Sequence, residues 1–125
     1  MGMTNTHKNR LDASTYSDDV PCQLRLQPDP RDEDTKPAEA WLSERLLARL
    51  RNLALAYELP LLARLPTAGA TTYPEIQLGS MEDELAFLFR VVSDPVLLEA
   101  IAPMREMIRV AIHHPRGWSL VVESP

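Results

Sequence analysis

The chain has 125 residues, of which 45% are apolar and 25% charged, and its formal net charge is −5 at pH 7. These values fit one soluble domain with its own core and exclude collagen-like chains. The acidic balance disfavours phosphate backbones as partners, and one cysteine, Cys22, excludes a disulfide within the chain. No apolar run reaches the roughly 18 residues that span a bilayer, and the start of the chain lacks a secretory signal. We therefore expect a cytoplasmic protein without a membrane partner.

The first part of the chain differs in composition from the rest. Residues 1–36 hold seven acids and five bases but few large apolar side chains. Such a segment buries too little surface to offset the entropy lost when its backbone is ordered. We expect residues 1–19 to form a flexible arm and residues 20–125 to form a single domain, with a charged linker at 28–36.

One extended strand is predicted within this part, at residues 20–27. Apolar and polar residues alternate there, which places Val20, Cys22, Leu24 and Leu26 on one face. Because Pro21 has no backbone N–H, we expect this strand at the edge of a sheet.

Residues 37–59 have the strongest helical pattern in the chain. Pro37 suits a first helical turn, Glu39 favours the positive end of the helix dipole, and a dense run of helix formers follows. One stripe of this predicted helix is the expected core face and contains Leu42, Leu46, Leu50, Leu53 and Tyr57.

The middle of the chain predicts short elements separated by prolines and loops. Residues 61–65 fit a helical turn, residues 68–72 a loop, and residues 73–78 a short extended piece. Ser80 and Asp83 form a capping-box pattern, which predicts a second helix over 81–92. Asp94 and Pro95 indicate another cap, opening a short helix that Pro103 interrupts.

The C-terminal part carries both helical and strand periods. Residues 104–114 fit either, and their β-branched side chains favour the strand. A proline and a glycine at 114–117 indicate a turn, and Trp118, Leu120 and Val122 then alternate as in a strand. The predicted fold is α+β: a small antiparallel sheet, made of this C-terminal hairpin with 20–27 as a candidate edge strand, packed against about three helices.

The sequence contains none of the usual nucleophile, metal, phosphate-loop or dinucleotide signatures. We therefore assign no catalytic residue, no metal ligand and no cofactor. The alternating apolar context of Cys22 indicates a small core residue. Glu82, Asp83 and Glu84 occupy a predicted first turn, where acids are favoured by the helix dipole and normally solvated.

One feature of the first predicted helix lies outside its core stripe. Trp41, Ala48 and Leu55 recur at intervals of seven, flanked by Arg45 and Asn52. A side chain as large as tryptophan is rarely left fully in water, so something is expected to cover it. Either the N-terminal strand or residues 61–65 fold back over these five residues, or the five form a surface for a partner protein or for self-association.

The leading functional hypothesis is a non-catalytic protein–protein interaction module, such as an adaptor, a chaperone, an immunity or antitoxin-like inhibitor, or a regulatory subunit. Its partner is another protein or a second copy in a homodimer. The acidic balance and an arm that could fold on a partner favour this hypothesis.

Two other functions stay open from the sequence. One is a small enzyme or ligand-binding domain that uses His113 or His114 with an acidic residue, Glu82 or Glu84. The other is a nucleic-acid-binding regulator that uses the arginines around the first predicted helix, namely Arg45, Arg49, Arg51 and Arg64. Glutamates are interleaved with these arginines, which favours a solvated, salt-bridged face and disfavours a nucleic-acid partner.

Overall fold

The computed structural model describes residues 16, 19–27, 38–113 and 118–125. The arm predicted at 1–19, apart from Tyr16 and Asp19, and the linker predicted at 28–36 lie outside this part, and both stay predictions. The elements follow in the order β1 (Pro21–Gln27), β2 (Glu39–Ser43), α1 (Glu44–Ala56), the 3-10 helix η2 (Leu62–Arg64), β3 (Gly69–Tyr73), α2 (Glu75–Val91), α3 (Pro95–His113) and β4 (Ser119–Ser124).

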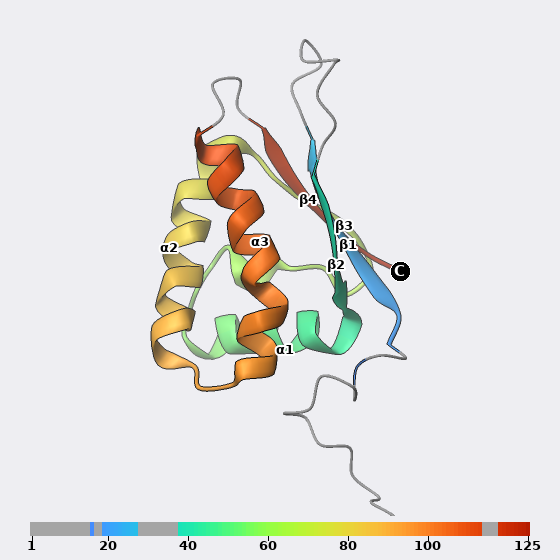
Figure 1. Ribbon diagram of the computed structural model, residues 1–125, viewed down its shortest axis with the longest axis vertical. Coiled ribbons are helices and arrows are strands. Elements are labelled where there is room, and N and C mark those ends of the chain that lie inside the picture. The colour runs from blue at the N-terminus through green and yellow to red at the C-terminus, as the bar shows by residue number, and fades with distance from the viewer. Residues whose placement is uncertain (1–15, 17–18, 28–37, 114–117) are drawn as a thin grey trace, which may run out of the picture.

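The four strands form one antiparallel sheet in the order β2-β1-β4-β3. The last strand in the sequence, β4, thus lies between β1 and β3. Helices α1, α2 and α3 lie on the same side of the sheet (Figure 1). The predicted α+β class, with a small antiparallel sheet and three helices, is confirmed.

The strand predicted near residues 20–27 is confirmed, but its place at the sheet edge is wrong. β1 pairs with β2 on one side and with β4 on the other. The β1–β2 hydrogen bonds fall on the even-numbered residues of β1, as Leu26 N–H donating to the Ala38 carbonyl shows. Pro21 therefore turns its nitrogen toward β4, beyond the last β1–β4 pair at Gln23. A proline is tolerated at such an end of the ladder.

The predicted C-terminal hairpin is wrong because its first strand does not exist. Residues 104–113 continue α3, which runs through Pro103 without interruption. Met104, Ile108 and Ala111 are buried at helical spacing, so burial follows the helical period rather than β-branching. Because Pro103 has no backbone N–H, the Glu99 carbonyl lacks the helical hydrogen bond that residue 103 would donate. Both residues lie on the exposed side of α3. The predicted turn at 114–117 lies outside the described residues.

The helix predicted over 37–59 is wrong at its start. Residues 39–43 form β2, and α1 begins only after Ser43, whose Oγ accepts a hydrogen bond from Leu46 N–H at 3.4 Å. A serine N-cap and a strand partner in β1 outweigh the helix propensity of this segment. Leu42, Leu46 and Leu50 of the predicted core stripe are buried, although Leu42 enters the core from a strand. Leu53 is only partly buried, and Tyr57 is wrongly assigned to the core because it is 44% exposed.

Two further boundaries differ from the sequence predictions. α2 begins at Glu75, so Ser80 lies inside the helix and caps nothing. β3 occupies the segment predicted as a loop, because β4 supplies its partner strand. The helical turn after Pro60 is confirmed as η2. The cap at Asp94 is also confirmed, since its Oδ1 accepts from Val96 and Leu97 N–H at 3.1 and 3.2 Å.

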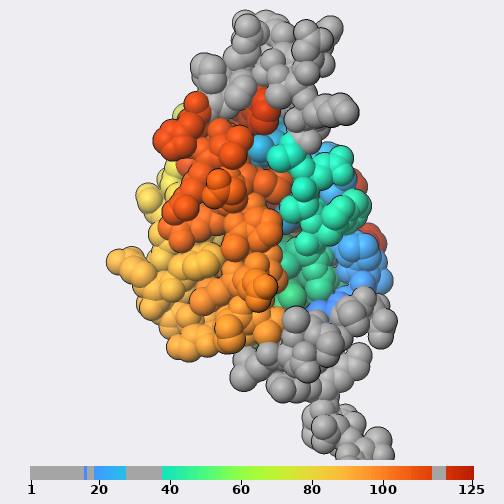
Figure 2. All heavy atoms as spheres, viewed as in Figure 1, coloured from blue at the N-terminus to red at the C-terminus, as the bar shows by residue number. Residues whose placement is uncertain are grey.

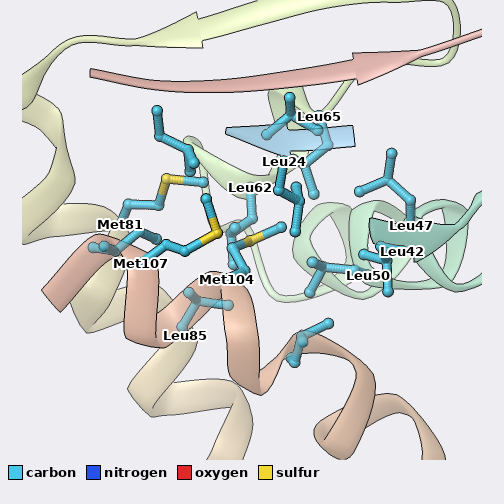
Figure 3. Packing of buried hydrophobic residues seen from close by; sticks show 14 of the residues in the cluster. Leu24, Leu42, Leu47, Leu50, Leu62, Leu65, Met81, Leu85, Met104 and Met107 are labelled. Atoms are coloured by element: carbon cyan, nitrogen blue, oxygen red, sulfur yellow. The ribbon is translucent and has the colours of Figure 1, made fainter. Parts of the chain in front are cut away.

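The core fills the space between the sheet and the helices (Figure 3). Leucines from β1, β2, α1 and η2 meet methionines from α2 and α3, and the close view labels Leu24, Leu42, Leu47, Leu50, Leu62, Leu65, Met81, Leu85, Met104 and Met107. All of these side chains are buried. The helices therefore cover one face of the sheet, the face from which these strand side chains enter the core.

Candidate functional site

The five residues predicted to bind a partner lie on two different elements. Trp41 belongs to β2, whereas Arg45, Ala48, Asn52 and Leu55 lie on α1. Side chains repeat about every two residues in a strand and about every 3.6 in a helix, so an interval of seven does not align Trp41 with Ala48. The single helical seam is wrong, and the assignment of these residues to partner binding stays a prediction.

Trp41 lies on the outer face of the sheet, which we define as the face turned away from the three helices. Its neighbour Leu42 points into the core, and successive side chains of a strand point to opposite faces. Trp41 is paired with Gln23 of β1, which is paired in turn with Glu123 of β4. The three side chains therefore form one row across the outer face. Trp41 is 59% exposed.

A hollow of about 460 Å³ lies beside this row, and we call it the Trp41 hollow. Its walls come from the first residues of β1 and β3, the middle of β2 and the C-terminal end of β4. They are Pro21, Gln23, Trp41, Gly69, Glu123, Ser124 and Pro125. Indole and proline rings thus meet an amide and a carboxylate. A concave surface with apolar walls and a few polar groups is typical of a binding site.

The polar side of the Trp41 hollow is organised by Arg25. Its Nη1 donates to Gln23 Oε1 at 3.0 Å and lies 3.6 Å from Glu123 Oε2. Glu39 of β2 is paired with Arg25 across the sheet and is exposed. Two carboxylates therefore flank one guanidinium here, and the local charge is negative.

The α1 part of the predicted surface lines a second hollow, of about 280 Å³, which we call the Tyr16 hollow. Its walls are Tyr16, Arg45, Ala48, Arg49 and Asn52. Tyr16 is buried: its ring centroid lies 5.0 Å from the Arg45 guanidinium carbon, and its hydroxyl accepts from Arg49 Nη1 at 3.3 Å. A residue that precedes β1 thus packs on this face of α1. It belongs to neither of the two segments that were expected to fold back, the N-terminal strand and residues 61–65.

The charges around the Tyr16 hollow are paired within the chain. Arg45 Nε lies 2.8 and 2.9 Å from the two Asp19 carboxylate oxygens, and Ser43 Oγ donates to Asp19 Oδ2 at 2.5 Å. The hydrogen bond from Arg45 lowers the pKa of Asp19 from 3.8 to about 2. Arg49 pairs with Asp94, the carboxylate that caps α3. These contacts tie the start of β1 and the start of α3 to α1.

The remaining arginines of the nucleic-acid hypothesis also have partners within the chain. Arg51 Nη1 lies 3.4 Å from the Pro66 carbonyl, and the Arg64 guanidinium carbon lies 5.8 Å from the Tyr73 ring centroid. In the space-filling view, β2 and α1 lie beside α3 (Figure 2). Each of the four arginines thus has a contact within the described residues, while Arg45 and Arg64 are also exposed to solvent. The nucleic-acid hypothesis stays untested.

The acidic residues of the enzyme hypothesis serve the packing of helices. Buried Glu84 accepts hydrogen bonds from Leu61 and Leu62 N–H at 3.1 and 2.9 Å, which fixes the start of η2. Glu82 Oε1 accepts from Arg105 Nε at 2.9 Å, joining α2 to α3. Exposed His113 ends α3 and makes no hydrogen bond to a carboxylate within the described ranges, and His114 lies outside them.

Cys22 is a core residue, as its sequence context predicted. It is fully buried, its Sγ lies 3.7 Å from Ser124 Oγ, and burial raises the pKa of its thiol. In the part of the chain that the structure describes, no three histidine, cysteine, aspartate or glutamate side chains are grouped to hold a metal ion.

Gln23 and Glu123 of the outer face were not predicted from the sequence as site residues. Both occupy polar positions in alternating segments, so period two could have placed them on the solvated side of their strands. Their meeting with Trp41 depends on strand pairing between distant segments, which periodicity does not reveal.

Comparisons with known proteins give no match to a family model, to a curated protein or to a solved structure. Among helices 44–56, 62–64, 75–91 and 95–113, none is long and apolar enough to cross a membrane.

Proposed function

We propose that this protein is a non-catalytic protein–protein interaction module that binds another protein through the outer face of its sheet. The observation that carries this proposal is Trp41, a tryptophan 59% exposed in the middle of β2 and beside a hollow of about 460 Å³. Tryptophan is enriched among the residues that dominate binding energy, and its burial by a partner is favourable.

The chemistry around Trp41 fits an interface. Pro21 and Pro125 extend the apolar surface, while Gln23, Arg25 and Glu123 surround it with polar groups. Protein interfaces commonly combine a desolvated aromatic centre with a hydrated polar rim. An adaptor or regulatory subunit acting in the cytoplasm is the role that we propose for such a surface.

Another protein suits this face better than a second copy of the chain. Face-to-face self-association would bring together two surfaces that each carry Glu39 and Glu123 around a single arginine, Arg25, among the described residues. Like charges placed opposite each other in an interface are unfavourable. A homodimer is therefore the competing occupant that the experiment must exclude.

Site-specific photocrosslinking tests which face binds. A crosslinking amino acid at Gln23 on the outer face is compared with one at Ile76, which is 85% exposed at the start of α2. A protein crosslinked in host cells is identified, purified and tested again with the purified chain. We expect crosslinks to a different protein from position 23 and none from 76. Crosslinks from 76 alone, or only between copies of the chain, would contradict the proposal.

A further inference from the structure

The Trp41 hollow is bordered by an aromatic ring on one side and a carboxylate on the other. Trp41 and Glu123 are both paired with Gln23, one through β2 and the other through β4. Neighbouring strands are about 4.8 Å apart, so these two positions are separated by about 10 Å. The Gln23 side chain lies between them in the row, and the hollow of about 460 Å³ that all three residues line provides the space for one flat or small cationic group in reach of both Trp41 and Glu123.

The same row of residues already holds a guanidinium group. Arg25 donates to Gln23 at 3.0 Å and lies 3.6 Å from Glu123. The second distance is longer than a hydrogen bond, and a carboxylate can accept about four. The Glu123 side chain is also 49% exposed. Glu123 therefore retains capacity to accept hydrogen bonds from a further cation.

The charge of this surface favours a basic partner. Among the described residues of the outer face, Glu39 and Glu123 outnumber Arg25, and the whole chain has a net charge of −5. Electrostatic complementarity directs association and selects among partners.

We infer that the Trp41 hollow binds an arginine or lysine side chain of the partner protein, with the cation against the Trp41 indole and its N–H groups donating to Glu123. Cations are attracted to the faces of indole rings, and hydrogen bonds between ionised groups are stronger than neutral ones. This inference rests on the proposed function, because it names the chemistry that the interface recognises.

A pair of peptides tests the inference directly. The probes are blocked pentapeptides with one central residue between glycines, either arginine or citrulline, which keeps the size of arginine but carries no charge. The readout is the NMR signal of the Trp41 indole N–H, assigned by its loss in Trp41→Phe. We expect the arginine peptide to shift this signal with an affinity in roughly the millimolar range and the citrulline peptide to bind at least about tenfold more weakly.

Matched charge variants then locate the carboxylate. Glu123→Gln should weaken binding of the arginine peptide about tenfold, whereas Glu99→Gln, an exposed position on α3, should leave it unchanged. Arg25→Gln removes the competing guanidinium and should strengthen binding several-fold. Thermal melting of each variant shows whether the fold is retained.

The outcomes separate this inference from the proposed function. Equal binding of both peptides, or no effect of Glu123→Gln, overturns the cation site. If crosslinking still maps a partner to position 23, the interaction module stands with a different recognition chemistry. If no arginine peptide moves the Trp41 signal and no partner crosslinks at 23, both proposals fail.

Discussion

Arg45 binds Asp19 through both carboxylate oxygens, and this pair joins Asp19, two residues before β1, to the first turn of α1. The pair fixes the direction in which the chain enters the sheet, next to the strand that carries Trp41. Ser43 contributes to the same junction, since its Oγ donates to Asp19 and also caps α1.

The Asp19 pair should make stability depend on acidic pH. The carboxyl has a pKa of about 2 in the fold and an ordinary value of 3.8. Because the folded value is the lower one, its stabilisation is complete above about pH 4 and is lost as the pH falls toward 2. We expect Asp19→Asn to lower the melting temperature at pH 7, and this difference from wild type to shrink below pH 4. A difference that stays constant down to pH 2 would contradict the role given to the pair.

Glu84 should contribute to the folding stability of the protein and not to a catalytic activity. It is buried and satisfies the N–H groups of Leu61 and Leu62. Glu84→Ala leaves two donors without their acceptor, which should lower the free energy of unfolding by about 1–3 kcal/mol. Glu75→Ala, at an exposed position in the first turn of α2, is the matched control. Urea denaturation measures both, and equal effects of the two substitutions would contradict this role.

The Cys22 thiol should be protected in the folded protein. It is fully buried, and burial raises the pKa of the thiol, so the reactive thiolate is disfavoured. We expect an aromatic disulfide reagent to modify Cys22 only as fast as the protein unfolds, and Cys22→Ser to leave partner binding within a few fold of wild type. Rapid modification under native conditions would show that the thiol is accessible.

Charges placed in the core and on the outer face should have opposite effects. Leu50 is fully buried in α1, so Leu50→Asp puts an unpaired carboxylate into the core and should unfold the domain. Trp41→Glu changes an exposed side chain and should leave the circular dichroism spectrum nearly unchanged. A folded Leu50→Asp protein, or an unfolded Trp41→Glu protein, would show that the two faces are wrongly assigned.

The sequence predicted the structure correctly where the spacing of apolar residues along a segment matches the spacing of its buried residues. Alternation placed the shared face of Cys22, Leu24 and Leu26 correctly, whereas Val20, predicted on the same face, precedes β1 and is 48% exposed. The Asp94 cap was visible because a cap is a local interaction. Together with the helical periods, these signals were sufficient for the α+β class.

Errors arose where partners are distant in the sequence. Residues 39–43 have helix-forming side chains, yet they form a strand because they pair with β1. The strand predicted over 104–114 rested on β-branched residues, while the tertiary fold uses the helical face of Met104 and Ile108. Strand propensity depends strongly on such context.

The candidate site could be predicted only in part. Trp41 was singled out correctly as a large side chain outside the core, but its neighbours were sought along a helix. Gln23 and Glu123 join it through pairings with β1 and β4 that no local pattern contains.

The most direct test of the central claim is the dissociation constant of the purified partner for wild type, Trp41→Glu and Leu55→Glu, measured by calorimetry. Leu55 is 58% exposed on α1 and lines neither of the two hollows, so it is matched to Trp41 in exposure. If Trp41 anchors the interface, its substitution should weaken binding at least about thirtyfold, a loss of about 2 kcal/mol, while Leu55→Glu changes it less than about threefold. Wild-type affinity in a folded Trp41→Glu protein would contradict the claim that the outer face of the sheet binds the partner.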